Sequence, residues 1–133
     1  MRFVVDCGAV LRLAAEGRDV PAEHQLLAPT LLRSQTLSAL HAAVHRGELS
    51  AEAARERLTR VNAMPIRLLG DAVLRRRAWE IAEQLGWEQT YDAEYIALTQ
   101  LQADALVTVD VELARRVAGV VETASFDVLY AAS

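Results

Sequence analysis

The sequence predicts an α/β fold in which a mostly parallel central sheet is flanked by helices. The first observation behind this prediction is that short, β-prone apolar runs alternate with longer segments of helical pattern. The second is that the chain has 133 residues, 53% of them apolar, with no internal repeat and no linker. We therefore expect a single domain over residues 1–133, with roughly four to five short strands.

The first elements are read from the apolar run at the start of the chain. Residues 3–5 (FVV) are predicted to form a strand that ends at Asp6. A helix rich in Ala and Leu follows from Gly8, and Gly17 closes it. Residues 17–25 are polar and are predicted to form a loop.

The middle of the chain is dominated by two helical segments. A helix is predicted from Pro29 and Thr30 to about residue 46, where Gly47 is a suitable C-cap. A second helix is predicted over 50–63, and a strand over 66–69. We therefore expect a helical hairpin inserted between the first and the second strand.

The rest of the chain returns to the alternating pattern. The expected elements are, in order, a helix over 71–86 capped by Asp71, a helix over 93–103, a strand over 105–109, a helix over 111–118 and a last strand over 120–124. The final segment, 126–133, has no clear pattern.

The charge balance excludes a protein that binds nucleic acid through an overall positive charge. There are 14 basic residues, all of them Arg, against 18 acidic residues, so the net charge is −4. Any contact with RNA or DNA must then come from a local group of arginines, or from metal ions held by acidic side chains. The single cysteine, Cys7, excludes an internal disulfide and a cysteine-rich zinc site.

The apolar segments are too short for a membrane span, which needs about 18 residues or more. The N-terminal residues also lack the pattern of a signal peptide. We therefore expect a cytoplasmic protein that does not bind a membrane.

Three aspartates are predicted to converge. Asp6 and Asp110 each follow a predicted strand, and Asp92 lies at the start of a helix. Strand ends and the following helix starts lie on one edge of a parallel sheet, where ligands bind at the point of strand-order reversal. Three carboxylates repel each other unless a cation neutralises them, and oxygen ligands suit Mg²⁺ or Mn²⁺. Alternatively, each aspartate is a helix N-cap or a turn former.

The segments V-V-D, T-Y-D-A-E-Y-I-A-L-T and A-L-V-T-V-D-V-E-L-A resemble the PIN-domain ribonucleases. The resemblance covers nearly the whole chain and is strongest to the toxins of bacterial VapBC-type toxin–antitoxin pairs. It implies a Mg²⁺- or Mn²⁺-dependent endoribonuclease, an antitoxin that blocks the site, and a homodimer. It also implies that Asp6, Asp92 and Asp110 bind the metal and that Thr108 lies beside the site.

The sequence departs from the family pattern at one site position. The family carries a Glu in a segment like P-x-L-L-x-x-E, and Gln35 stands in that place. Glutamine offers a carbonyl oxygen but has no charge and is no base. Two interpretations stay open: a protein that binds RNA or antitoxin with weak or absent cleavage, or an active enzyme in which Gln35 orients a metal-bound water. Glu94 and Glu112 are two further acidic candidates for the site.

Several other side chains are considered for binding. The expected RNA contacts are Arg12, Arg115, Arg116 and Tyr91. The pair His41 and His45 shares a helix face but has no third ligand nearby in the sequence, so a solvated face is favoured. Trp79 and Trp87 are expected either in the core or at a dimer or antitoxin contact.

Overall fold

The computed structural model describes residues 1–132 and contains a five-stranded sheet in which every pairing is parallel. The strands are β1 (Arg2–Val5), β2 (Gln25–Pro29), β3 (Ile66–Leu69), β4 (Ala105–Val107) and β5 (Thr123–Ala124). Their order across the sheet is β3-β2-β1-β4-β5. The predicted α/β class and parallel sheet are confirmed.

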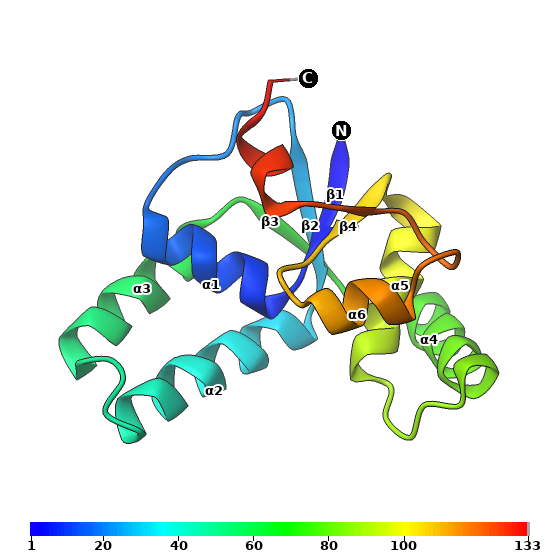
Figure 1. The fold of residues 1–133 in the computed structure, drawn as a ribbon, viewed down its shortest axis with the longest axis horizontal. Helices are drawn as coiled ribbons and strands as arrows, with labels where there is room; N and C mark the ends of the chain where they lie inside the picture. Colours follow the sequence, from blue (N-terminus) through cyan, green and yellow to red (C-terminus); the bar gives the residue numbers. More distant parts are fainter. Residues whose placement is uncertain (133) are drawn as a thin grey trace.

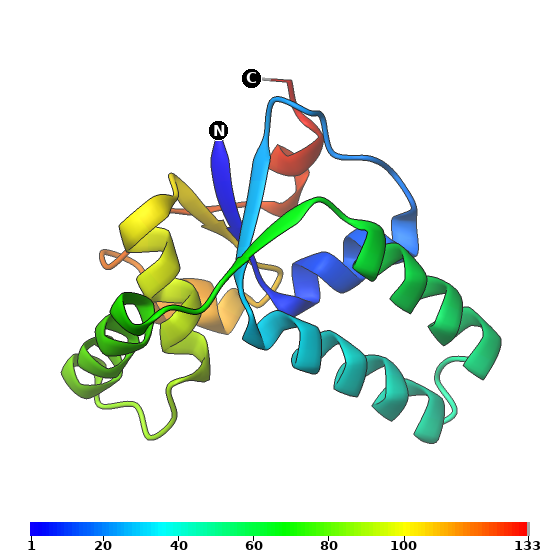
Figure 2. The same ribbon diagram turned by 180° about the vertical axis from the view of Figure 1, so that it is seen from behind.

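The helices cover both faces of this sheet (Figures 1 and 2). They are α1 (Cys7–Glu16), α2 (Leu31–His45), α3 (Ala51–Ala63), α4 (Ala72–Leu85), α5 (Tyr91–Gln102), α6 (Val111–Arg116) and the 3-10 helix η1 (Phe126–Tyr130). In both views the α2–α3 hairpin extends to one side of the molecule, and α4 with α5 lies on the other. Within residues 1–132, no helix combines the length and the apolar character that crossing a membrane requires.

One strand was missed by the sequence analysis. Residues 17–25 were expected to be loop and Pro29 to begin a helix, but residues 25–29 form β2, between β1 and β3. The α2–α3 hairpin therefore joins the second strand to the third, not the first to the second. The physical reason is that β2 is covered on both faces, so its buried residues Leu26 and Leu27 show no alternation with polar ones.

Other boundaries differ by one to three residues, and two of these differences concern the site. The helix predicted over 93–103 begins at Tyr91, so Asp92 lies inside its first turn. The strand predicted to reach Val109 ends at Val107, because the Thr108 hydroxyl accepts a hydrogen bond from the Asp110 backbone amide and turns the chain out of the sheet. The last strand is reduced to residues 123–124.

The core lies between the central strands and α5. Phe3, Val5, Leu106 and Ile96 are fully buried, and α5 contacts α4 on one side and β1, β2 and β4 on the other. This packing fixes the direction of α5, because its buried residues run along the helix from Ala93 onward. The N-terminus of α5 consequently lies at the sheet edge where β1 and β4 end (Figure 1).

Candidate active site

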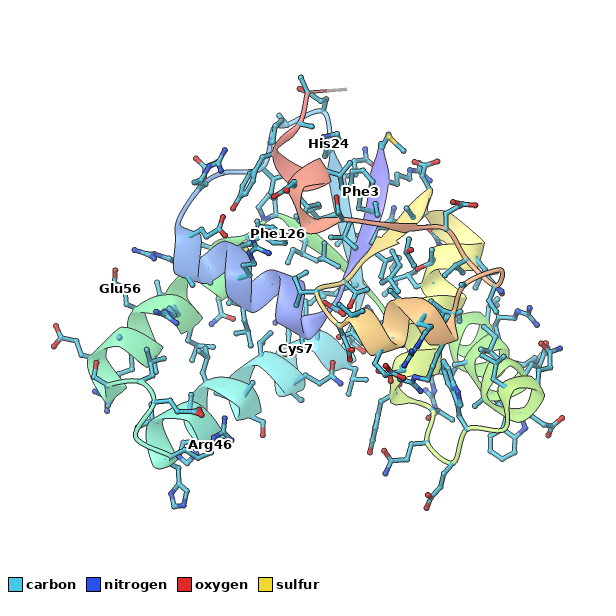
Figure 3. The ribbon with its side chains drawn as sticks, viewed as in Figure 1. Phe3, Cys7, His24, Arg46, Glu56 and Phe126 are labelled. Atoms are coloured by element: carbon cyan, nitrogen blue, oxygen red, sulfur yellow. The ribbon has the colours of Figure 1, made fainter. Side chains whose placement is uncertain are left out.

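The candidate site lies where the order of the strands reverses. From β1 the chain passes through α1 to β2 on one side, and from β4 it passes through α6 to β5 on the other. The starts of α1 and α6 therefore meet at the carboxyl ends of two neighbouring strands (Figure 1), the edge at which open parallel sheets bind ligands. In Figure 3, the label of Cys7 marks the first residue of α1, directly after Asp6.

Asp6 is a partly buried carboxylate with a structural role. Its Oδ1 accepts the Ala9 backbone amide at 2.9 Å and so caps α1. Burial raises the pKa of Asp6, and the nearby carboxylates of Asp110 and Asp92 raise it further, whereas hydrogen bonds from Thr108 and Ala9 act in the opposite direction. Asp92 and Asp110 are thus both near enough to Asp6 to raise its pKa.

Asp110 and Thr108 link the two strand ends. Asp110 Oδ1 accepts the backbone amides of Glu112 and Leu113, at 3.0 and 3.1 Å, and so caps α6. The Thr108 hydroxyl accepts the Asp110 amide at 3.0 Å and also forms a hydrogen bond with Asp6. The N-cap interpretation is therefore correct for Asp6 and Asp110.

Asp92 has a different environment. It is not an N-cap, because it is the second residue of α5, and its carboxylate pairs with the guanidinium of Arg116 at 3.2 Å. That guanidinium also lies over the ring of Trp87, 5.0 Å from the ring centroid. Arg116 was expected to contact RNA, and the structure places it against one of the aspartates.

Gln35 is held by a residue that the sequence analysis did not single out. The Tyr95 hydroxyl donates a hydrogen bond of 2.6 Å to Gln35 Oε1. Tyr95 is only 2% exposed; burial raises the pKa of its hydroxyl, and the neighbouring Cys7 and Asp6 raise it further. Tyr95 follows Asp92 by three residues, so the two side chains lie on adjacent parts of the helix surface. This spacing is the feature of the sequence that indicates a place for Tyr95 near the site. Gln35 therefore lies next to Tyr95, with its carbonyl oxygen already engaged.

A polar cavity of about 620 Å³ opens beside these residues. It is lined by Gln35, Gly86, Trp87, Glu88, Gln89, Tyr91, Asp92 and Arg116. The cavity is large enough for a nucleotide and joins the Gln35 position to the Asp92–Arg116 pair. Tyr91, another expected RNA contact, is half-exposed on its wall.

The side chains of four other predicted residues interact with groups other than the three aspartates. Arg12 pairs with Glu16 at 2.9 Å and lies 4.1 Å from the centroid of the Phe126 ring, where it helps to hold η1 against α1. Arg115 is ion-paired with Glu112. Burial raises the pKa of Glu94, and the charge that opposes this shift is Arg75 on α4.

The donor chemistry of the site suits a hydrated hard cation. In the part of the chain that the structure describes, no three His, Cys, Asp or Glu side chains form a ready-made ligand set. Among these residues the His41–His45 pair therefore has no third ligand. Two of the three aspartates cap helices and one pairs with Arg116. Carboxylate oxygens are hard ligands, and an ion such as Mg²⁺ takes one or two of them while it retains several water ligands.

Gly8 permits the close approach of the two loops. A Cβ atom at this position would lie 2.8 Å from Val109 Cγ2 and 3.8 Å from Asp6 Oδ1. We expect Gly8→Ala to displace the Val109 segment, lowering the free energy of unfolding by about 1–3 kcal/mol and weakening metal binding. Thermal melts and Mn²⁺ titration measure both effects. Val109→Ala in the same chain should restore both, and no recovery would show that the contact with Val109 is not the cause.

The chain is similar in sequence to curated ribonucleases of two mycobacteria. No family model matches the chain. It is 32% identical to the VapC ribonuclease Mb0985 of Mycobacterium bovis and, equally, to ribonuclease VapC9 of Mycobacterium tuberculosis. Each match extends over 114 residues, which are 84% of this chain and 87% of the relative.

Solved structures share the fold along almost the whole chain. PAE2754 from Pyrobaculum aerophilum superimposes with a TM-score of 0.76 at 26% identity, covering 98% of this chain and 93% of the other. VapBC-1 from nontypeable Haemophilus influenzae superimposes with a TM-score of 0.59 at 15% identity, covering 95% of this chain and 98% of the other.

Proposed function

This chain belongs to the VapC family of PIN-domain ribonucleases, and on that premise we propose that it is an endoribonuclease that hydrolyses RNA phosphodiester bonds with Mg²⁺ or Mn²⁺. The observation that carries the proposal is the position of the three aspartates. Asp6 and Asp110 follow neighbouring strands at the switch point of the sheet, and Asp92, in the first turn of α5, is near enough to raise the pKa of Asp6. These three residues would hold the ion.

The chain's own residues prepare the site for this chemistry. When bound, the ion supplies an activated water and a positive charge beside the phosphate under attack. Thr108 holds the Asp6 carboxyl against the Asp110 loop, and the helix caps keep both side chains in place. Gln35 and Tyr91 line the cavity through which a nucleotide reaches this edge.

The proposal includes a role as the toxin of a toxin–antitoxin pair, inhibited by a cognate antitoxin, and a homodimeric state. The relatives are VapC proteins. The name of VapBC-1 of Haemophilus influenzae, whose structure is similar, supports an antitoxin partner. Trp79 on α4 is 67% exposed, so it lies outside the core. An exposed ring is what a contact with a second copy or with an antitoxin requires. We expect such a protein contact to cover its ring.

One observation favours a second candidate function, an RNA- or antitoxin-binding protein with little cleavage. The carbonyl oxygen of Gln35 accepts the Tyr95 hydroxyl, and an amide carries no charge. A site with three carboxylates binds a divalent cation less strongly than a site with four. Cleavage assays separate this candidate from the enzyme.

The test is cleavage of a mixed pool of tRNA and rRNA with Mg²⁺ or Mn²⁺. We expect wild-type protein to cut RNA and Asp6→Ala to abolish the cuts. The matched control is Asp71→Ala, because Asp71 caps α4 by accepting the Leu74 amide at 2.9 Å, as Asp6 caps α1, but lies outside the site. Equal losses in both variants, or cuts that persist without added metal, would contradict the proposal.

A further inference from the structure

Arg116 is positioned between a carboxylate, an aromatic ring and an open cavity. It is the last residue of α6, and its guanidinium lies 3.2 Å from Asp92 Oδ2 and 5.0 Å from the centroid of the Trp87 ring. All three side chains line the 620 Å³ cavity. The same cation therefore contacts a proposed metal ligand and faces the space that a nucleotide would enter.

The guanidinium and a divalent cation compete for Asp92. Both are positive, so an ion bound by Asp92 repels a guanidinium that stays in contact with the same carboxylate. The existing pair is weak enough to be displaced, because its side chains are 41% and 46% exposed and exposed ion pairs contribute little stability. Metal binding should therefore release Arg116 from Asp92.

The released side chain has a suitable second role. Stacking on Trp87 keeps its guanidinium at the wall of the cavity when the carboxylate is lost. A planar guanidinium donates paired hydrogen bonds to phosphate oxygens, and it is never deprotonated in the physiological range. Its neighbour Arg115 pairs with Glu112, which is not one of the three proposed metal ligands, so a bound cation does not compete for its partner.

We propose that Arg116 is an exchangeable counter-ion: it neutralises Asp92 in the metal-free protein and binds an RNA phosphate in this cavity once a divalent cation has replaced it. This inference rests on the proposed function and specifies its order of events. Metal binding creates the phosphate subsite, so the metal and RNA bind cooperatively. The ligand class is the phosphate group of an RNA strand next to the cleaved bond.

The proposal predicts effects of opposite sign from one substitution. In Arg116→Gln we expect Mg²⁺ to bind about three- to tenfold more tightly, because its competitor is gone. We expect KM for RNA to rise about tenfold, because a charged donor to phosphate is lost. The salt dependence of kcat/KM should also become shallower by about 0.7 in logarithmic slope, the value for one contact with a single strand.

Two further variants separate this role from general charge and from packing. Arg46→Gln removes the same charge from an exposed ion pair, with Glu48, at the far end of α2 (Figure 3), and should change none of these quantities. Arg116→Lys keeps the competing charge, so Mg²⁺ affinity should return toward the wild-type value while RNA binding recovers only in part.

Fluorescence supplies a readout that is independent of activity. Trp79 and Trp87 are the two tryptophans, and the exposed Trp79 can be replaced by Phe to leave Trp87 as the only reporter. Mg²⁺ should then change the Trp87 emission, because the stacked guanidinium loses its carboxylate partner. The change should be absent when Arg116→Gln is added and retained with Arg46→Gln.

The outcomes distinguish this inference from the function on which it rests. Suppose that the wild type binds Mg²⁺ and cleaves RNA, but Arg116→Gln lowers Mg²⁺ affinity or leaves it unchanged. That result would overturn the exchange at Asp92 and leave the proposed ribonuclease function standing. Tighter Mg²⁺ binding without a higher KM would overturn the phosphate contact. Wild-type protein that neither binds Mg²⁺ nor cleaves RNA would overturn the proposed function and the exchange together.

Discussion

Asp6→Asn is expected to abolish metal-dependent RNA cleavage and, at the same time, to make the metal-free protein more stable. Asparagine is a good N-cap and can still accept the Ala9 amide, so the start of α1 should be unchanged. The lost ligand charge should lower the cleavage rate by about a thousandfold, since a bound metal contributes several kcal/mol to transition-state stabilisation. The rate is measured on the RNA that the wild type cuts.

The gain in stability follows from the electrostatics of the site. Burial and the carboxylates of Asp110 and Asp92 raise the pKa of Asp6 above its ordinary value of 3.8. The ionised form of Asp6 is therefore less favourable in the folded state than in the unfolded state. Removing that charge should raise the Tm in EDTA by about 2–5 °C at neutral pH.

The pH dependence of this difference has a definite sign. A carboxyl with a raised folded-state pKa contributes stability that is present below its unfolded pKa and is lost as the pH rises through the folded value. The Tm advantage of Asp6→Asn should therefore be full above the raised pKa of Asp6 and vanish as the pH falls toward 3.8. Asp71→Asn, a cap substitution outside the site, should show no such advantage, and an equal gain there would refute this explanation.

Gln35→Glu is expected to strengthen metal binding about tenfold and to increase the cleavage rate. The new carboxylate adds a negative charge to the cavity wall that Gln35 shares with Asp92, and Coulomb attraction to a divalent ion a few ångströms away is large enough for this change. Its side chain has the shape of glutamine and can accept the Tyr95 hydroxyl in place of Gln35 Oε1. Mn²⁺ titration and cleavage of the same RNA measure both effects.

The metal-free form of this variant should be less stable than the wild type, because another carboxylate then lies on the cavity wall with Asp92. Mg²⁺ should reverse the difference, so the Tm shift caused by Mg²⁺ is larger in Gln35→Glu. The control is Tyr95→Phe. This substitution should weaken metal binding more in the Gln35→Glu variant than in the wild type, because the Tyr95 hydroxyl donates a stronger hydrogen bond to an ionised carboxylate than to an amide. If Gln35→Glu slowed cleavage, the native amide would itself be the group that orients water.

The sequence determined the parts of this protein that depend on neighbours along the chain. The alternation of apolar runs and helical segments predicted the parallel α/β class, and the PIN-domain resemblance is confirmed by the family. The caps at Asp6, Asp71 and Asp110 were readable because an aspartate and the amide that it accepts are separated by two or three residues. These local hydrogen bonds can therefore be predicted from the sequence without the fold.

Only the tertiary structure decided which side chains meet at the site. The strand β2 was missed because its identity depends on being covered on both faces, a property of the packed sheet and not of the segment. Gln35 meets Tyr95, 60 positions away, because α5 packs across the central strands and lies beside the start of α2. Arg116 lies between Asp92 and Trp87 because α6 ends beside the first turn of α5. The proposed competition between a metal ion and the Arg116 guanidinium for Asp92 therefore depends on how these helices pack.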